Sequence, residues 1–188
     1  QKKKINLSPL KNVTKILNEK NLKVINIAIV VKYVDLKDAY KSLDEALVHG
    51  GIKNNVKIKI IRIESDKLKI SEIRNKLIDA SGILIPGGFG KRGTEGKIAC
   101  INYARENNIP FLGICFGMQM AVLEFARNVL KIKKAGSREF DKKCIPVVGL
   151  IEEWSKNGKI VKGTSTKLGG TMRLGLYTAK LQHNSQIR

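Results

Sequence analysis

Residues 111–119 read FLGICFGMQ, and the pattern changes there from a short apolar strand to a helix. The strand is predicted over residues 109–114 and the helix over residues 117–130. Between them stands Cys115, with a glycine two residues before it and another two residues after it. This arrangement is typical of a nucleophile elbow, a turn so tight that side chains at the flanking positions would collide. The stretch predicts that Cys115 is a nucleophile, although a lone Cys at the end of a strand is often only a buried apolar residue.

A second glycine-rich stretch, PGGFG at residues 86–90, ends the strand predicted before the elbow. Glycines let a backbone approach a reacting group closely, and an acyl-transfer enzyme needs N–H groups that face the developing oxyanion. The N–H groups of Gly88 and of Phe116, the residue after Cys115, are the candidate pair. A position at a helix N-terminus also favours the thiolate form of Cys115, because the helix dipole stabilises an anion there.

Strands and helices alternate over residues 24–130, which predicts a mostly parallel sheet with helices on both faces. The expected fold class is α/β, a three-layer α/β/α sandwich. The other strands predicted in this part are residues 24–31, 56–63 and 82–86, and the other helices are residues 36–49, 70–80 and 94–107. Asp35 is the predicted N-cap of the first of these helices, and Gly50-Gly51 is its predicted stop. After Leu130 the pattern predicts antiparallel strands at residues 146–151, 158–164 and 172–179.

Residues 1–22 are predicted to form a linker with a short amphipathic helix, and residues 23–188 to form one domain. The formal charge of the chain is +20, and 28 of its 36 basic residues are Lys. A charge this positive leaves a nucleic-acid-binding module open, because phosphate neutralisation drives such binding. The lysines are dispersed, however, and aromatic residues make up only 5% of the chain, unlike surfaces that stack bases. No specific nucleic-acid partner is therefore expected.

The composition also bounds the setting of the protein. No apolar run approaches the roughly 18 residues that a membrane span needs. The three cysteines are too few and too scattered for a disulfide framework or a zinc site. We expect a cytoplasmic protein with no bound metal in this domain and no contact with a membrane.

Four motifs extend the pattern around the elbow. They are GILIPGGFGKRGTEGKI at residues 82–98, ARENNIPFLGICFGMQ at 104–119, KYVDLKDAYKS at 32–42 and LGGTMRLG at 168–175. Together they resemble the class I glutamine amidotransferase domain of the CTP synthase family. The resemblance implies that Cys115 forms a glutamyl thioester, and that the ammonia released supplies the ATP-dependent amination of UTP to CTP. A synthetase domain of the same polypeptide would carry out that amination with ATP and Mg²⁺, and the glutaminase domain would need no cofactor.

The same resemblance implies roles for individual residues. The glutamine-binding residues would be Gly88, Phe116, Gly117, Met118, Gln119 and Glu139, the last holding the amino group of glutamine. GTP is the allosteric activator of the family, and the loops linked to its response would contain Arg92, Gly93, Glu95, Thr171, Met172 and Arg173. The full-length protein is expected to be a homo-oligomer.

The chain also departs from the family pattern. Val31 stands where the family usually has Gly, and Phe116 stands where Leu is more usual. The catalytic His and Glu of the family lie beyond the equivalent of Arg188, so a domain cut short before its base is expected. His49 and His183 are predicted to be structural or solvated. Two other functions stay open: another elbow hydrolase of the same fold, such as a γ-glutamyl hydrolase or a cysteine peptidase relative, and the basic nucleic-acid-binding module.

Overall fold

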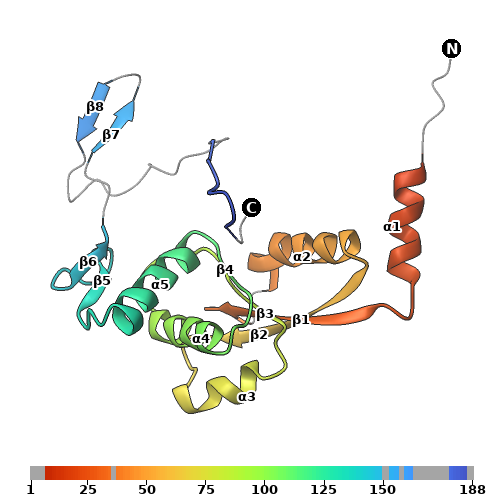
Figure 1. Ribbon diagram of the computed structural model, residues 1–188, viewed down its shortest axis with the longest axis horizontal. Helices are drawn as coiled ribbons and strands as arrows, with labels where there is room; N and C mark the ends of the chain where they lie inside the picture. Colours follow the sequence, from red (N-terminus) through yellow and green to blue (C-terminus); the bar gives the residue numbers. More distant parts are fainter. Residues whose placement is uncertain (1–6, 35–36, 150–152, 157–158, 163–177, 186–188) are drawn as a thin grey trace. The chain divides into compact units, whose positions relative to one another are not determined.

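The computed structural model describes residues 7–34, 37–149, 153–156, 159–162 and 178–185. The chain divides into two compact units, Gln1–Gly149 and Leu150–Arg188. All residues of the predicted elbow belong to the first unit, whose elements are labelled in Figure 1. The boundary predicted between residues 22 and 23 stays a prediction.

The first unit is built on a four-stranded sheet in the order β2-β1-β3-β4. Its strands are β1 (Lys23–Val31), β2 (Val56–Glu64), β3 (Gly82–Ile85) and β4 (Phe111–Gly113). Strand β1 pairs with both β2 and β3, and β3 pairs with β4, in every case in parallel. The prediction of a mostly parallel sheet is confirmed.

Helices cover both faces of this sheet. Successive β1 side chains point to opposite faces, so β1 contributes to the packing on both sides. Ala28 and Val30 join the core cluster that contains residues of α3 (Ile73–Leu77), α4 (Thr94–Glu106) and α5 (Phe116–Glu124). Ile29 and Val31 join a second cluster, which packs against Leu43 and Leu47 of α2 (Lys41–Lys53). The near-continuous apolar run of β1 is thus buried on two sides, and the three-layer prediction is confirmed (Figure 1).

The predicted end of the first large helix is wrong. A short 3₁₀ segment, η1 (Lys37–Tyr40), leads into α2, which continues through both glycines to Lys53. Gly51 is needed for packing and not for termination, because a Cβ there would lie 2.8 Å from the Val56 carbonyl oxygen. The predicted N-cap, Asp35, lies outside the described residues.

Two other helices differ from their predicted lengths. The segment predicted as one helix over residues 70–80 is a 3₁₀ turn, η2 (Ile70–Glu72), followed by the five-residue α3. The helix predicted over residues 117–130 is α5 followed by a π-helical turn, η3 (Phe125–Val129). The Leu130 N–H donates to the Phe125 carbonyl at 3.0 Å, which is the i to i−5 spacing of a π-helix. Apolar spacing alone does not distinguish these helix types.

After Leu130 the strand prediction is partly wrong. Strand β5 (Ala135–Ser137), which was not predicted, pairs in parallel with β6 (Ile145–Val148). Alternating apolar residues fix which face of a strand is buried, but they do not encode its direction. In the second unit, β7 (Glu153–Lys156), which was also not predicted, pairs antiparallel with β8 (Lys159–Lys162), which lies within the strand predicted over residues 158–164. Of the strand predicted over residues 172–179, only residues 178 and 179 are described, and they are not in a strand.

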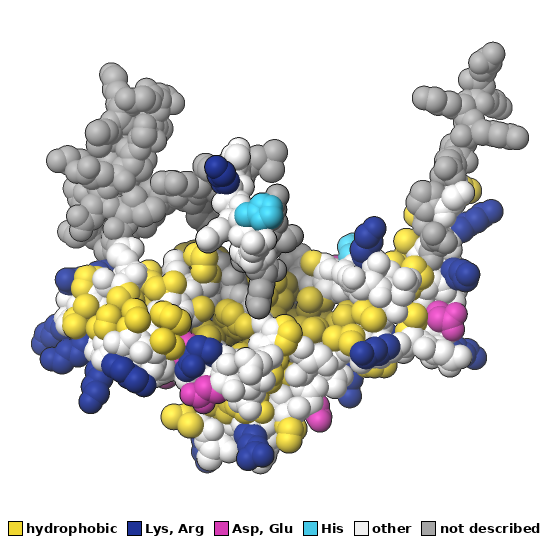
Figure 2. Space-filling model, in the orientation of Figure 1, with side chains coloured by type: hydrophobic (Ala, Val, Ile, Leu, Met, Phe, Trp, Pro, Cys, Tyr) yellow, Lys and Arg dark blue, Asp and Glu magenta, His cyan; other side chains and the backbone are white. Residues whose placement is uncertain are grey.

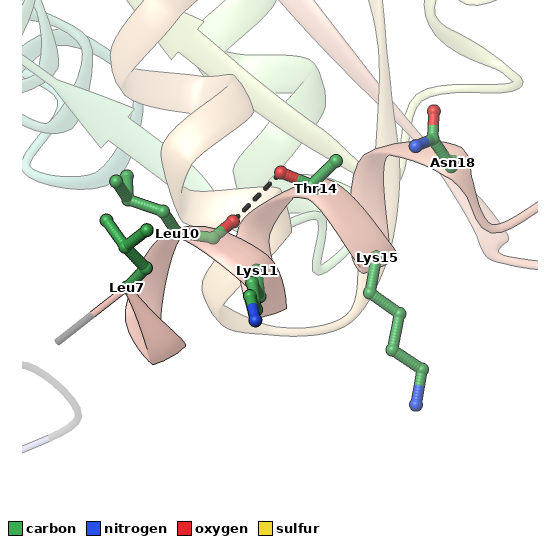
Figure 3. A pocket seen from close by; sticks show the side chains of 6 residues that line it. All are labelled: Leu7, Leu10, Lys11, Thr14, Lys15 and Asn18. Atoms are coloured by element: carbon green, nitrogen blue, oxygen red, sulfur yellow. Dashed lines mark hydrogen bonds between the residues drawn. The ribbon is translucent and has the colours of Figure 1, made fainter.

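The amphipathic helix predicted within residues 1–22 is α1 (Ser8–Asn18). Its Leu10 and Leu17 side chains are exposed, and a groove runs along the helix between Leu7 and Asn18 (Figure 3). Within it, the Thr14 hydroxyl donates to the Leu10 carbonyl at 2.9 Å, as Figure 3 shows. The Thr14 hydroxyl is therefore bonded to the backbone of its own helix, and the Leu10 and Leu17 side chains stay exposed.

The adjacent glycines of α2 give a direct test of the packing. Gly50→Ala places its methyl group in open space, so we expect a gain of about 0.5–1 kcal/mol in unfolding free energy from the higher helix propensity of Ala. Gly51→Ala forces a methyl group against the Val56 carbonyl and Ile58, so we expect a loss of about 1–3 kcal/mol. Urea unfolding of both variants measures the difference. Shifts of the same sign would contradict the register of α2 on β2.

Candidate active site

Cys115 occupies a strained turn between β4 and α5. Its backbone angles are φ 52° and ψ −104°, a region that residues with a Cβ rarely adopt and that costs on the order of 1–3 kcal/mol. Two hydrogen bonds of 2.9 Å hold the turn: the Ile114 N–H donates to the Ile85 carbonyl, and the Gly117 N–H donates to the Ile114 carbonyl. The turn projects Cys115 to the surface, whereas the other two cysteines, Cys100 and Cys144, are buried.

The two glycines that flank Cys115 are required by close backbone approach. A Cβ at Gly113 would lie 2.6 Å from the Gly117 carbonyl carbon, and a Cβ at Gly117 would lie 2.1 Å from the Ile85 carbonyl oxygen. Both collisions are with backbone, which cannot rotate away as a side chain does. The glycines therefore allow α5 to begin directly on the ends of β3 and β4.

The predicted oxyanion donors are the N–H groups of Phe116, directly after Cys115, and of Gly88, in the loop after β3. Phe116 is the first residue of α5, where N–H groups have no acceptor within the helix. The next N–H, of Gly117, already has an acceptor in the Ile114 carbonyl. On the other side, a Cβ at Gly87 would lie 3.7 Å from the Cys115 Cβ, while the space beside Gly88 is open. The loop after β3 therefore passes close to Cys115 at Gly87, and the oxyanion roles of Gly88 and Phe116 stay predictions.

The Phe116 ring is the packing centre beneath this turn. The side chain is only 1% exposed. The Lys97 ammonium lies 5.0 Å from its ring centroid and the Lys32 ammonium 5.4 Å, both within cation–π distance. The Phe140 ring makes an edge contact with it at 6.5 Å between centroids. Residues from the end of β1, the first turn of α4 and the segment after β5 therefore meet on the residue that follows Cys115.

Both of these lysines are electrostatically perturbed. Burial, together with the neighbouring Lys32 charge, lowers the pKa of Lys97 to about 8. Burial also lowers the pKa of Lys32, while the Glu139 carboxylate opposes the shift and Arg92 adds to it. The Lys32 ammonium donates to the Phe89 carbonyl and, at 3.3 Å, to the Gly90 carbonyl. Lys32 thereby ties the loop after β3 to the end of β1.

The structure brings Glu139 to the same loop. Its carboxylate accepts a hydrogen bond from the Gly90 N–H, although the two residues are 49 positions apart in the chain. The Glu139 side chain is exposed and thus open to a ligand. The sequence by itself gave no sign of this placement, which the family resemblance implied.

The predicted GTP-response residues do not form one cluster among the described residues. The Arg92 guanidinium donates to Asp66 at 2.7 Å and lies 5.0 Å from the Tyr33 ring centroid, and the Asp66 hydrogen bond raises the Arg92 pKa. Glu95 instead pairs with Arg127 at 3.0 Å. Gly93 between them has a positive φ of 71° and lies against the Ser65 hydroxyl. Thr171, Met172 and Arg173 lie outside the described residues.

Of the remaining predicted residues, Met118 and Gln119 lie at the start of α5, and the two histidines lie on other segments. Met118 is exposed and Gln119 half-buried. His49 is exposed on α2, near the start of β2, while Cys115 follows the far end of the parallel strand β4. His183 is exposed and its Nδ1 lies 2.9 Å from the Asn184 side-chain oxygen. In the described ranges, no group of three or more His, Cys, Asp or Glu side chains is placed to hold a metal ion.

Sequence reasoning missed Lys32, Lys97 and Phe140 as neighbours of Phe116. A signal for Lys97 was present, because the buried positions of α4 include residues 94, 97, 98, 101 and 104, at helical spacing. A Lys at such an apolar position is unusual unless it is paired. Its partner, the ring of Phe116, lies 19 positions away and is brought there by the βα connection, which no local pattern shows.

Comparison with known proteins identifies the family. A sequence model described as glutamine amidotransferase class-I matches residues 35–187. The chain belongs to the class-I glutamine amidotransferase family. It is similar to the CTP synthase of Pelagibacter ubique (strain HTCC1062), at 66% identity over 99% of this chain and 34% of that protein. It is also similar to the CTP synthase of Gluconobacter oxydans (strain 621H), at 54% identity over 87% of this chain and 30% of that protein.

The amidotransferase fold is shared with a solved structure. The Trypanosoma brucei CTPS glutaminase domain with bound acivicin matches with a TM-score of 0.61 and 41% identity, over 64% of this chain and 47% of that chain. The chain spans about a third of the length of the curated relatives it matches. The prediction of a class I glutamine amidotransferase is confirmed.

The surface of the described residues adds two observations. On the face shown in Figure 2, Lys and Arg side chains lie at several separate places and not in one continuous patch. None of the helices in the described part of the chain is long and apolar enough to cross a membrane. The dispersed charge gives no support to the nucleic-acid-binding module.

Proposed function

We propose that this chain hydrolyses glutamine to glutamate and ammonia through a thioester on Cys115. The observation that carries the proposal is the geometry of Cys115, an exposed residue at positive φ between two glycines that admit no Cβ. The family match supplies the substrate, since class-I amidotransferases act on glutamine. It also favours this function over a γ-glutamyl hydrolase, a peptidase relative or a nucleic-acid module.

In the first half-reaction, the Cys115 sulfur attacks the carboxamide carbon of glutamine. The carbonyl oxygen becomes an oxyanion, and the N–H groups of Gly88 and Phe116 are the proposed donors to it. When the intermediate collapses, the C–N bond breaks, ammonia leaves with a proton, and the glutamyl group stays on sulfur. In the second half-reaction, water attacks the thioester, and glutamate and the free thiol are released.

Both half-reactions need a proton to be moved, which a general acid–base group accelerates by about 10²–10⁴. His49 lies on α2, near the start of β2 and thus at the opposite end of the parallel strands from Cys115, so we do not propose it for this step. We assign the proton transfer to a group other than His49. The residues described around Cys115 bind the substrate and stabilise the oxyanion.

Glutamine recognition is proposed to use the loop after β3 and the segment after β5. Glu139 would accept the amino group of glutamine, since its carboxylate lies against the loop that passes Cys115. Gly88 and the first turn of α5, with Gly117, Met118 and Gln119, would line the pocket for the side chain of glutamine. The exposed position of Met118 on that turn supports this assignment.

The relatives named CTP synthase suggest where the ammonia goes. We propose that it passes to a synthetase domain of the same polypeptide, which aminates UTP to CTP with ATP and Mg²⁺. GTP would activate the reaction through the Arg92 and Glu95 regions and the loop with Thr171, Met172 and Arg173. A cytoplasmic homo-oligomer is proposed on the same ground.

The nucleophile assignment is tested by ammonia release from glutamine in the full-length protein. Cys115→Ala removes the attacking sulfur, so we expect the rate to fall by at least about 10³. Cys144→Ala is the control, because that buried thiol donates to the Asp141 carbonyl and has no place in the reaction. Glutaminase activity that survives in Cys115→Ala would refute the proposed function, whatever the activity of Cys144→Ala.

Glu139 is tested by a change that keeps its structural contact. Glu139→Gln retains an oxygen that can accept from the Gly90 N–H, but it loses the charge that would hold the amino group of glutamine. We expect the KM for glutamine to rise while the unfolding free energy changes by less than about 0.5 kcal/mol. Steady-state kinetics and urea unfolding measure the two effects. An unchanged KM with a large loss of stability would assign Glu139 a structural role only.

A further inference from the structure

Lys97 is a buried cation without an anionic partner among the described residues. Its side chain is only 1% exposed, and it lies on the first turn of α4. Within the described ranges the Lys97 ammonium group has no hydrogen bond or ion pair. It makes a cation–π contact with the Phe116 ring, 5.0 Å from the ring centroid. A buried ammonium group is costly, and an apolar side chain of the same length would avoid that cost. A residue that lowers stability in this way is a candidate for function.

The backbone around Lys97 is fixed. A Cβ at the preceding residue, Gly96, would lie 2.1 Å from the Ser65 carbonyl oxygen, so the first turn of α4 is pressed against the residue that follows β2. The ring that Lys97 contacts is equally buried and belongs to the residue after the nucleophile. The Lys97 ammonium group thus extends from a closely packed helix turn to the side chain of Phe116, whose own N–H is the proposed oxyanion donor.

We propose that Lys97 is a positioning residue for glutamine hydrolysis: its buried ammonium group holds the Phe116 ring, and with it the Phe116 N–H, where the oxyanion forms. The inference rests on the proposed function. Lys97 acts through Phe116 and does not touch the substrate. The contact depends on the aromatic ring of Phe116, because an aliphatic side chain at this position could not make a cation–π contact.

The proposal predicts which kinetic constant responds. A donor aimed at the oxyanion acts on the transition state and not on bound glutamine, so its displacement lowers kcat and leaves KM unchanged. Removing one such donor outright costs about 10²–10³ in kcat. Displacing it by loss of the Lys97 contact is expected to lower kcat by about tenfold.

The proposal also predicts a pH dependence. With a pKa of about 8, Lys97 loses its charge at mildly alkaline pH, and the contact with the ring weakens. Lys32, at the end of β1, is the charged group that acts on Lys97, and Glu139, Arg92 and Asp66 act on Lys32 in turn. We expect kcat to fall as pH rises through about 8 in the wild type. Lys97→Arg keeps its charge and should shift this fall to higher pH, and Lys97→Met should abolish it.

Stability changes in the opposite direction. The folded pKa of Lys97 lies below its ordinary value of 10.5, so between about 8 and 10.5 the unfolded state binds more protons and the wild type gains stability as pH rises. Below pH 8 the wild type carries the full cost of the buried charge. Lys97→Met removes that cost, so its Tm should equal or exceed that of the wild type at pH 7. The difference should shrink as pH approaches 10.

The experiment measures kcat, KM and Tm of the full-length protein for Lys97→Met, Lys97→Arg, Phe116→Leu and the double variant Lys97→Met/Phe116→Leu. Support is a kcat about tenfold lower in Lys97→Met, with KM and Tm maintained, and recovery of most of that loss in Lys97→Arg. The double variant should be no slower than Phe116→Leu, because the ring through which Lys97 acts is already gone.

Three results would overturn the inference. They are a wild-type kcat in Lys97→Met, a joint fall of kcat and Tm, and an equal further loss from Lys97→Met in the Phe116→Leu background. Cys115→Ala, measured alongside, separates a failure of the role of Lys97 from a failure of the proposed function. If Cys115→Ala is inactive while Lys97→Met is fully active, only the role of Lys97 fails; if Cys115→Ala stays active, the proposed function itself fails.

Discussion

The contact between Gly117 and the Ile85 carbonyl oxygen is the constraint on which the candidate site depends. An added Cβ would lie 2.1 Å from that oxygen, so α5 begins as close to the end of β3 as a backbone allows. The connection from β4 must then turn within a few residues, and Cys115 takes up the positive φ that this turn requires. The strain of Cys115 and the lack of side chains at its flanks are therefore one geometric fact. Any residue larger than glycine at position 117 would move Cys115.

The same contact brings Phe116 next to two buried lysines. Because α5 starts at the end of β3, its first residue, Phe116, is buried between the end of β1 and the first turn of α4, where Lys32 and Lys97 lie. The loop after β3 passes Cys115 on the other side and is held by the Lys32 ammonium and the Glu139 carboxylate. Positive charge near the site thus comes from buried lysines on separate elements.

Features of the fold and the candidate site that depend on a local sequence pattern could be predicted, and features that depend on contacts between distant segments could not. The run at residues 24–31 and the glycines around Cys115 are local patterns, and they predicted the central strand, the parallel sheet and the elbow. Gly50 and Gly51 look like a helix stop, but α2 continues because Gly51 packs on Val56, a contact made only after the chain has folded back. The parallel pairing of β5 with β6 was hidden for the same reason, since alternation carries no direction. Lys97 looked like one more lysine in a lysine-rich chain until the structure placed it on the Phe116 ring.

We propose that the Cys115 sulfur carries the glutamyl group during glutamine turnover. The most direct measurement is rapid acid quenching of the full-length protein with glutamine, followed by mass mapping of its cysteine-containing peptides. Acid quenching preserves a thioester, and the two buried cysteines, Cys100 and Cys144, serve as internal references. We expect one glutamyl group on the peptide with Cys115 and none on the other two. A glutamyl group on another cysteine, or turnover of glutamine with no glutamyl adduct on Cys115 at any quench time, would contradict it.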